Sequence, residues 1–182
     1  MIADIGTGDG RAALALARAE PGSLVIGLDA AAAAMAESSR RAARRGPANA
    51  IFLAAAAEAL ASTPFAGRVD HTIVNFPWGS LLRGVLGLEP AALVGVAALV
   101  APGGRLDVLA SAVPADRVVG VATLDGSWEP AICRAWGAAG LHLVSMRRAT
   151  SDEIAASRSS WARRLGAVGD TRPVWRLALC RP

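Results

Sequence analysis

The chain has 182 residues, of which 53% are hydrophobic, and a formal net charge of +4. A chain of this length buries roughly 70% of the surface that its unfolded form exposes, which predicts one domain spanning the whole sequence. Its apolar runs are interrupted well before the roughly 20 residues that a membrane span needs, and no basic and apolar leader precedes the first glycines. These patterns exclude a membrane protein and predict a soluble, cytoplasmic one.

Arginine supplies all the fixed positive charge, because the sequence contains no lysine. Residues 1–140 hold 11 arginines against 12 acids, whereas residues 141–182 hold 8 arginines against 3 acids. The carboxyl-terminal part is therefore the basic one, and guanidinium groups suit phosphate recognition. Cys133 and Cys180 lack the spacing of metal ligands, which predicts free, buried thiols and no metal site. His71 and His142 have no nucleophile or ligand cluster nearby, so we expect structural roles for both.

Strand-like and helix-like segments alternate along the chain. Strands are expected at residues 1–6, 23–30, 50–55, 68–76, 141–150 and 173–180, with a further strand after a Pro-Gly-Gly turn inside 90–110. Helices are expected at residues 11–20, 32–46, 58–63 and 129–140 and in the first part of 90–110. This alternation predicts an α/β fold with a parallel sheet covered on both faces. Residues 111–127 read as a mobile loop.

The first strand leads into D-I-G-T-G-D-G, which places glycines at positions 6, 8 and 10. Glycine lets the backbone turn sharply and approach a ligand closely. The G-x-G-x-G spacing differs from the G-x-G-x-x-G of dinucleotide sites, where pyrophosphate lies at a helix amino end. It therefore favours a cofactor without phosphates, such as S-adenosylmethionine, while a simple tight turn remains the alternative.

Acidic residues follow the next two strands. Asp29 ends the second strand, where its carboxylate can accept hydrogen bonds from both ribose hydroxyls of a nucleoside; the alternative is a helix cap. Glu58 follows the third strand and can lie beside the adenine of the same cofactor, or be an ordinary acid in the first turn of a helix. Acids at adjacent strand ends favour the cofactor interpretation.

The fourth strand ends in Asn75-Phe76-Pro77-Trp78. In open parallel sheets the carboxyl ends of the first and fourth strands adjoin, so the indole of Trp78 is expected near the cofactor. A tryptophan packed in the core is the alternative. The four residues also come close to the Asn-Pro-Pro-aromatic motif of methyltransferases that act on amino nitrogens, from which the second residue departs.

Six segments, taken in order, resemble the aminoglycoside-resistance (Kam-type) methyltransferases that modify N1 of adenine 1408 in the decoding site of 16S rRNA. They are DIGTGDG, GLDA, AAAEAL, FPWGSLLRGVLG, PGG and SSWARRL, and they cover nearly the whole chain. The resemblance implies a Rossmann-like class I methyltransferase fold with a seven-stranded, mostly parallel sheet. It also implies S-adenosyl-L-methionine as cofactor and the 16S rRNA of the small ribosomal subunit as partner, bound by a monomer.

The resemblance also implies roles for individual residues. Cofactor contacts are implied for Asp4, Gly6, Gly8, Asp29, Ala56, Glu58, Ser80 and, through its backbone, Asn75. Trp78 and Trp161 correspond to the two tryptophans that sandwich the flipped target adenine, with Pro77 beside the first. Ser159 and Arg164 match residues near the target nucleotide and its phosphate. On its own residues, Trp161 would equally suit a buried anchor for the basic segment.

Two runs of arginine are candidates for contacts with RNA phosphates, because structured RNA is recognised mainly by shape and backbone. The first comprises Arg40, Arg41, Arg44 and Arg45, and the second comprises Arg163, Arg164 and Arg172. A solvated helix face is the alternative for either run.

The expected reaction needs no general base, since N1 of neutral adenine carries a free lone pair and positioning supplies most of the catalysis. A methyltransferase acting on an exocyclic amino group and an inactive remnant that binds cofactor or RNA are the alternatives. The remnant is considered because the family has an amino-terminal segment, including a β-hairpin, that is not in this sequence; a start assigned too late is the other interpretation.

Overall fold

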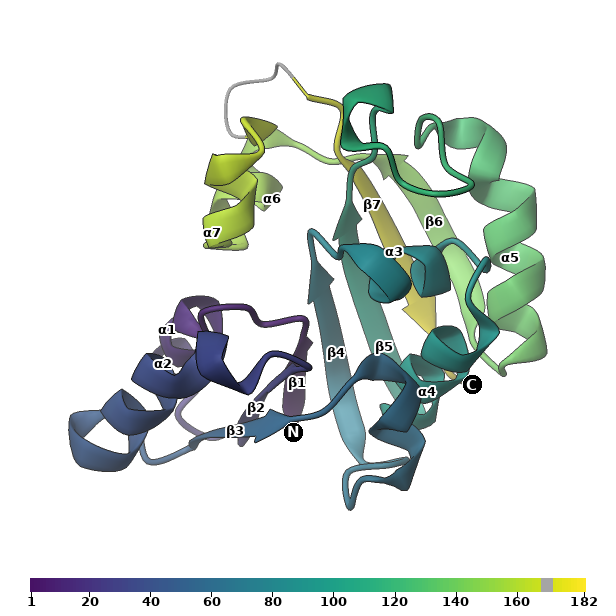
Figure 1. Ribbon diagram of the computed structural model, residues 1–182. Coiled ribbons are helices and arrows are strands. Elements are labelled where there is room, and N and C mark those ends of the chain that lie inside the picture. Colours follow the sequence, from purple (N-terminus) through teal and green to yellow (C-terminus); the bar gives the residue numbers. More distant parts are fainter. Residues whose placement is uncertain (168–171) are drawn as a thin grey trace.

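The computed structural model describes residues 1–167 and 172–182 and contains a seven-stranded sheet with helices on both faces (Figure 1). The strands are β1 Ile2–Ile5, β2 Val25–Asp29, β3 Ala50–Ala54, β4 Val69–Asn75, β5 Val100–Ala110, β6 His142–Arg148 and β7 Trp175–Cys180. Their order is β3-β2-β1-β4-β5-β7-β6, and only β7 runs antiparallel to its neighbours. The expected seven-stranded, mostly parallel α/β fold is confirmed.

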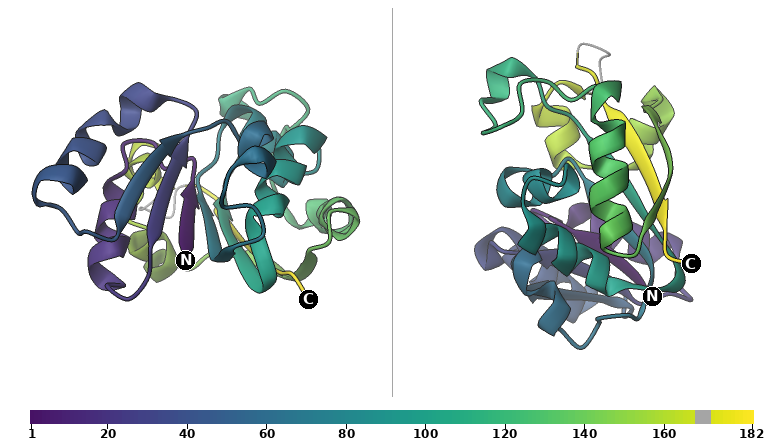
Figure 2. Two further views of the ribbon diagram at one scale, coloured as in Figure 1. Left: turned by 90° about the horizontal axis from the view of Figure 1, so that it is seen from below. Right: turned by 90° about the vertical axis from the view of Figure 1, so that its right-hand side faces the viewer.

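The helices are α1 Arg11–Ala19, α2 Ala32–Arg45, α3 Gly79–Val85, α4 Pro90–Leu99, α5 Glu129–Ala138, α6 Ser151–Ala156 and α7 Ser160–Arg164, with 3₁₀ turns η1 Ala57–Ser62, η2 Pro114–Asp116 and η3 Gly126–Trp128. The main core packs α3, α4 and α5 on one face of the sheet, and a smaller core packs α1 on the other face beside β2 and β3 (Figure 2). Helices α6 and α7 precede β7 and lie above the end of the sheet (Figure 1).

Strand β1 pairs in parallel with β2 on one side and with β4 on the other. After β1 the chain adds β2 and then β3 on one side of β1, and it then crosses to the other side and adds β4 and β5. The order of the strands therefore reverses between β1 and β4. Open α/β sheets bind ligands at such a switch point, outside the carboxyl ends of the strands. The expectation that the first and fourth strands end side by side is confirmed.

Close packing at the edge of this region depends on one glycine. Gly95 lies in α4 where a Cβ atom would come 1.9 Å from the carbonyl oxygen of Ala57, so only glycine fits. This contact holds η1, which carries Glu58, against α4. The acid that follows the third strand is thereby fixed beside the switch point.

Three details differ from the sequence-based expectations. Helix α3 begins at Gly79, directly after Trp78, where no helix was expected. The Pro-Gly-Gly turn lies inside β5, and the pairing with β4 shifts between Val69 and His71 to accommodate it. Residues 111–127 are not a free loop, because Val121 and Leu124 are buried in the main core.

In the described part of the chain, no helix taken alone has the length and apolar character required to cross a membrane. Helices α3 and α4, bent by 76° relative to each other, meet that test only as a pair, on length and composition alone.

Candidate active site

A cavity of about 310 Å³ opens at the carboxyl ends of β1, β2 and β4. Nine residues singled out from the sequence line it: Gly6, Gly8, Asp29, Ala56, Glu58, Pro77, Trp78, Ser80 and Trp161. They come from segments far apart in the sequence, which the parallel sheet brings to one edge. A small crevice beside it is lined by three more, Asp4, Asn75 and Ser159, together with Trp161.

The glycine turn has the conformation that its sequence predicts. Gly6, Gly8 and Gly10 all have positive φ, at 71°, 58° and 71°, which side chains with a Cβ rarely adopt. The turn is also tied to β2, because the Gly8 N–H donates to Asp29 Oδ2 at 2.8 Å. The other oxygen, Asp29 Oδ1, accepts from the Ala31 N–H at 2.8 Å, just before α2. Asp29 therefore has a structural role as well as a place in the cavity, and each oxygen retains capacity for another hydrogen bond.

Asp4 is 4% exposed and accepts a hydrogen bond from Thr7 Oγ1 at 2.7 Å. Burial raises the pKa of this carboxyl from its ordinary 3.8 to about 6, although the Thr7 hydroxyl favours the charged form and the nearby Asp29 and Asp9 oppose it. A cationic ligand beside Asp4 would stabilise the carboxylate. Without such a ligand, burial destabilises the ionised form of Asp4 next to the cavity.

The chemistry of the lining fits S-adenosylmethionine. Among the described residues that line the cavity, Asp29 and Glu58 are the charged ones and none is basic, so pyrophosphate would find no cationic partner there. Two carboxylates can accept hydrogen bonds from ribose and adenine, and the alanines at 30, 55, 56 and 57 give a flat apolar wall for a base. The site suits a nucleoside whose charge is positive rather than negative.

Two tryptophans project into this cavity from separate segments. Trp78 is 45% exposed and Trp161 is 38% exposed, although large aromatic side chains usually fill cores. By contrast, Trp136 is fully buried and its indole N–H donates to the Val85 carbonyl at 2.9 Å. A Cβ atom on Gly8 would lie 3.6 Å from the indole nitrogen of Trp161, so this ring covers the glycine turn. The buried-core alternative is therefore wrong for both Trp78 and Trp161.

The turn before Trp78 is strained. Phe76 has φ 52°, a left-handed conformation that costs a non-glycine residue on the order of 1–3 kcal/mol. Its N–H donates to the Leu109 carbonyl at 2.7 Å and its ring is buried, so the surrounding structure holds it in place. Gly79, with φ 57°, then starts α3. Two such residues around Pro77 and Trp78 turn the indole out of the sheet.

Helix α7 presents the second tryptophan. Ser159 precedes the helix and its hydroxyl accepts from the Ala162 N–H at 3.4 Å, which makes it the amino-terminal cap. The Arg164 guanidinium lies 5.5 Å from the centre of the Trp161 ring, at cation–π distance, and Arg163 and Arg164 are exposed. The sequence-predicted residues of this segment therefore gather around one indole.

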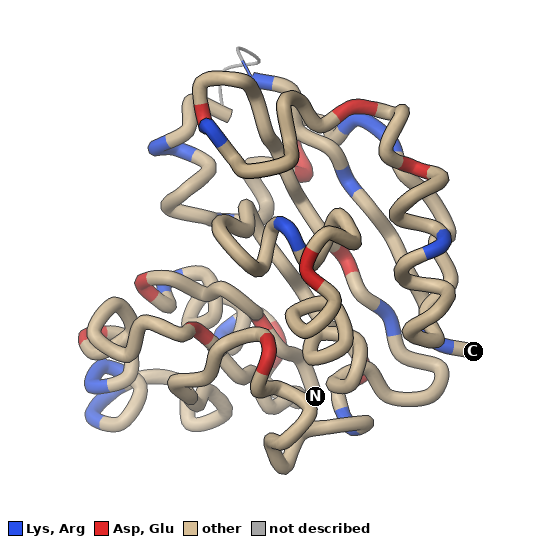
Figure 3. The backbone as a smooth tube through the Cα atoms, turned by 45° about the vertical axis from the view of Figure 1, so that its right-hand side comes forward, with Lys and Arg blue, Asp and Glu red and all other residues tan. Residues whose placement is uncertain are grey.

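The first arginine run lies on an exposed face at the carboxyl end of α2. Arg40 forms an ion pair with Glu37 at 2.9 Å, and Arg41, Arg44 and Arg45 are exposed. All four border a hollow of about 360 Å³. Figure 3 shows this concentration of basic positions at one end of the molecule. The geometry is compatible with a docking surface and with a solvated helix face.

The structure corrects the expectation for Arg172. Its guanidinium is only 9% exposed, donates to Ser111 Oγ at 2.8 Å and forms a bidentate ion pair with the Asp116 carboxylate. It thus anchors residues 111–116 to the segment before β7 instead of joining Arg163 and Arg164 at the surface. A single arginine near a basic run gave no sequence signal for a buried partner 56 residues away. Cys133 is likewise exposed where a buried thiol was expected, although both cysteines are free.

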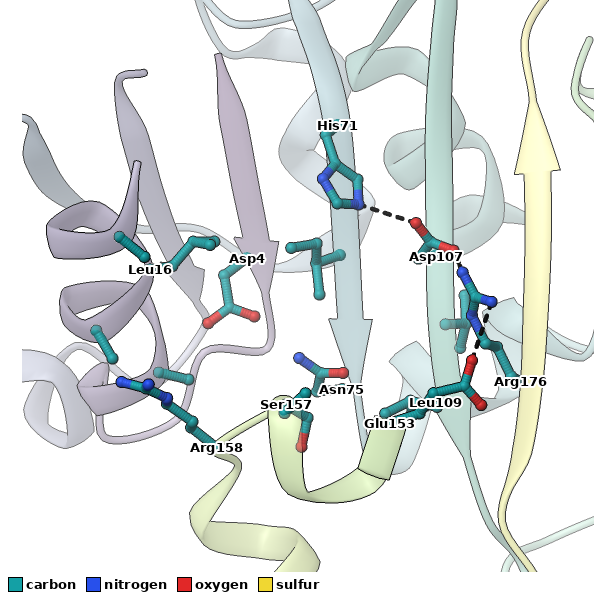
Figure 4. A pocket seen from close by; sticks show the side chains of 16 residues that line it. Asp4, Leu16, His71, Asn75, Asp107, Leu109, Glu153, Ser157, Arg158 and Arg176 are labelled. Carbon is teal, nitrogen blue, oxygen red and sulfur yellow. Dashed lines mark hydrogen bonds and ion pairs between the residues drawn. The ribbon is translucent and has the colours of Figure 1, made fainter. Parts of the chain in front are cut away.

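A second cavity, of about 450 Å³, was not foreseen (Figure 4). It lies on the other side of β1 and β4, between α1 and α6, and Asp4 and Asn75 border both it and the crevice beside the cofactor cavity. Its polar wall is a chain of one hydrogen bond and two ion pairs that runs from β4 through β5 and β7 to α6. The contacts are His71 Nε2 to Asp107 at 2.9 Å, Asp107 to Arg176 at 2.7 Å and Arg176 to Glu153 at 3.1 Å.

These ion pairs fix the charge states of both acids. The hydrogen bond from Arg147 lowers the pKa of Glu153 to about 2, and Arg176 acts in the same direction. Burial by itself would raise the pKa of Asp107, but the hydrogen bonds from His71 and Arg176 outweigh it and lower the pKa. Both carboxylates are therefore ionised and fully engaged, which suits a structural role in anchoring α6. His71 contacts Asp107 and Arg105, and its structural role stays a prediction.

The fold and the cavity define this chain as a class I S-adenosylmethionine-dependent methyltransferase. A family model described as "NpmA: 16S rRNA (adenine(1408)-N(1))-methyltransferase" matches residues 1–179. The chain belongs to this family.

Named relatives agree. The chain is 37% identical over 180 residues to a 16S rRNA (adenine(1408)-N(1))-methyltransferase from Streptoalloteichus tenebrarius, a match that covers 93% of this chain and 82% of the relative. A crystal structure of the 16S rRNA (adenine(1408)-N(1))-methyltransferase from Catenulisporales acidiphilia, a W203A mutant with cosubstrate SAM, is 31% identical with a TM-score of 0.86 and covers 99% of this chain and 84% of that one. The aminoglycoside resistance methyltransferase NpmB1 is 34% identical with a TM-score of 0.77, covering 100% and 86%.

Proposed function

We propose that this protein transfers a methyl group from S-adenosylmethionine to N1 of adenine 1408 in 16S rRNA of the small ribosomal subunit, and thereby confers aminoglycoside resistance. The observation that carries the proposal is the pair of exposed indoles, Trp78 and Trp161, at the mouth of a carboxylate-lined cavity. Membership of the family supplies the position and the atom.

The residues of the cavity have distinct proposed tasks. Asp29 and Glu58 hold the ribose and adenine of the cofactor, Ser80 and Ala56 line its pocket, and Gly6 and Gly8 allow its close approach. Asp4 holds the positively charged end, and the backbone of Asn75 borders the reacting group. S-adenosylmethionine supplies an electrophilic methyl group on a positively charged sulfur.

The remaining residues act on the target base. Trp78 and Trp161 hold the flipped adenine between their rings, and stacking of about 1–3 kcal/mol per base offsets the few kcal/mol that flipping costs. Pro77 stiffens the turn below the base, and Ser159 and Arg164 contact the nucleotide and its phosphate. N1 of neutral adenine carries its own lone pair, so no side chain needs to remove a proton. Orientation by the two indoles is then the main catalytic contribution of the protein.

The docking surface proposed for the subunit combines the α2 arginines with Arg163 and Arg164. Phosphate contacts of this kind supply affinity that does not depend on base sequence. Both indoles come from one chain, which supports action as a monomer. Small ribosomal subunits are cytoplasmic particles in bacteria, so the proposed place of action is the cytoplasm.

The test uses purified protein, labelled cofactor and isolated small subunits. The proposal predicts that label enters 16S rRNA and that primer extension stops at position 1408 in treated subunits only. Large subunits serve as a control and should remain unlabelled. Label at another nucleotide, or none with a cofactor-binding protein, would reject the proposed target.

A further inference from the structure

A third group of buried apolar side chains lies apart from the two cores of the sheet. It comprises Phe76, Leu109, Ile154, Ala162, Ala167 and Val174, and we call it the satellite cluster. Phe76 is its only aromatic member, and each member is 7% exposed or less. The cluster joins α6 and α7, which lie outside the sheet, to the ends of β4 and β5 and to the segment before β7.

The satellite cluster is the common base of the two exposed tryptophans. Phe76 stands two residues before Trp78, and Ala162 follows Trp161 directly. The two cluster residues are 4% and 1% exposed, whereas the indoles are 45% and 38% exposed. Each tryptophan therefore lies one or two residues along the chain from a side chain that is buried in the same small core.

Both anchors are held from several sides. The Phe76 N–H donates to the carbonyl of Leu109, itself a cluster member, at 2.7 Å. On the other side, Glu153 of α6 pairs with Arg147 at 2.7 Å and with Arg176 at 3.1 Å, which ties that helix to β6 and β7. Ile154, the next residue, places α6 in the cluster. Strain at Phe76 persists because these contacts determine its position.

We propose that Phe76 is a positioning residue whose ring, seated in the satellite cluster, fixes the spacing between Trp78 and Trp161. The inference rests on the proposed function, in which a flat base enters between the two indoles. A misplacement of about 1 Å in a reacting group can lower a rate by about 10²-fold. Because the Phe76 ring and Ala162 belong to one buried cluster, the bulk of the ring sets that spacing before any base arrives.

The test compares Phe76→Leu with Val100→Ala. The first keeps the Cβ atom and the strained backbone and removes only the bulk of the ring. The second removes apolar volume from the main core, at a site remote from both indoles, and the melting temperatures of the two variants are measured so that their rate losses are compared at known stability. We expect Phe76→Leu to lower the single-turnover rate of methyl transfer about tenfold or more at saturating cofactor and subunit. Phe76 also borders the cofactor cavity, so calorimetry checks that cofactor is saturating for each variant, and we expect the subunit affinity of Phe76→Leu to change less than about threefold.

A second measurement reports on the surroundings of the Trp161 indole without catalysis. In protein labelled with ¹⁵N at tryptophan, the indole N–H signal of Trp161, assigned by Trp161→Phe, should shift in Phe76→Leu and stay in place in Val100→Ala. If Phe76→Leu does not fold, Phe76→Met keeps more of the packing and should give a smaller shift in the same direction.

The outcomes separate this inference from the proposed function. An unmoved Trp161 signal overturns the inference, as does a rate loss in Phe76→Leu no larger than that in Val100→Ala. Absence of methyl transfer by the wild-type protein would count against the proposed function, and the indole signal would still decide the role of Phe76.

Discussion

At the scale of single residues, two carboxyl groups on the neighbouring strands β1 and β2 differ in their burial and in their hydrogen-bond donors. Asp29 is half-buried and accepts hydrogen bonds from two backbone N–H groups, so its carboxyl oxygens are oriented acceptors. Asp4 is buried with one hydroxyl donor, and its pKa is raised to about 6. The first is suited to neutral hydroxyl donors, and the second gains most from a positive ligand.

The Asp29→Ala variant should bind the cofactor at least about tenfold more weakly, because it loses the proposed acceptors for the ribose hydroxyls and frees the glycine turn from β2. Asp29→Asn is the matched control, since its amide oxygen can still accept one of these bonds, and its loss should be smaller. Isothermal calorimetry measures both, and melting curves check folding. Equal affinity in wild type and Asp29→Ala would leave Asp29 with the capping role alone.

The stability of the ligand-free protein should depend on pH through Asp4. The pKa of Asp4 is raised in the folded state, so the unfolded chain ionises at a lower pH than the folded protein does. The contribution of Asp4 to the free energy of unfolding is therefore intact below about pH 4 and is lost as the pH rises to about 6. Asp4→Asn removes this loss, and its free energy of unfolding should exceed that of the wild type by roughly 3 kcal/mol more at pH 7 than at pH 4. Denaturant titrations at several pH values measure the difference.

Cofactor binding gives the complementary reading of Asp4. A protonated Asp4 cannot pair with a cation, so wild-type affinity should fall as the pH drops below about 6. Asp4→Asn should bind the cofactor more weakly, and its affinity should depend less on pH. Parallel profiles for the two proteins would show that Asp4 does not face the charged end of the cofactor.

At the scale of elements, the β4–α3 turn and α7 each deliver one indole to the cavity. Either single change, Trp78→Ala or Trp161→Ala, should lower the rate of methyl transfer by about 10²-fold or more while leaving cofactor affinity and folding nearly unchanged. Phenylalanine at either position should recover part of the rate, since stacking needs an aromatic face more than an indole N–H. Trp136→Phe, in the core, is the control.

Stability separates the clamp from a packing role. A core tryptophan would cost roughly 3–5 kcal/mol on replacement by alanine, and activity would then fall only with the folded fraction. Denaturant melts beside single-turnover assays distinguish the two patterns. A folded Trp78→Ala protein with full activity on small subunits would rule out the clamp.

Helix α2 makes a separate prediction about docking. Replacing Arg40, Arg41, Arg44 and Arg45 together with Glu should weaken binding to the small subunit and flatten its dependence on salt, because fewer counterions are released. Cofactor affinity should hardly change, because none of these four arginines lines the cofactor cavity. Replacing the exposed Arg134 on α5 with Glu provides a control of the same kind. An unchanged salt slope would make the α2 face a solvated surface.

At the scale of the whole molecule, local sequence patterns predicted the order of strands and helices well, but they did not predict the side-chain contacts between distant residues. Alternating strands and helices indicated the sheet, and glycines and acids at strand ends indicated the cavity, because both follow from periodicity and from the geometry of parallel strands. The buried pair of Arg172 and Asp116 joins residues 56 positions apart, so no local pattern could reveal it. The same holds for the ion pairs from His71 to Glu153 and for the satellite cluster.

The sequence also left the atom of attack open. Asn75 at the end of β4 suggested an exocyclic amino target as the alternative, yet its side chain borders the crevice and the second cavity rather than the main cavity that holds both indoles. Orientation of the base between the indoles, not proton removal, would then select the ring nitrogen.

The most direct measurement is the chemical identity of the methylated nucleoside. Small subunits are incubated with the protein and labelled cofactor, the decoding-site fragment is isolated, and its nucleosides are separated and identified by mass spectrometry against 1-methyladenosine and N6-methyladenosine standards. Label should appear in 1-methyladenosine from position 1408, and its initial rate of formation should be about 10²-fold lower with the Trp78→Ala variant. Label in N6-methyladenosine, or an unmodified fragment with folded, cofactor-binding protein, would contradict the proposed function.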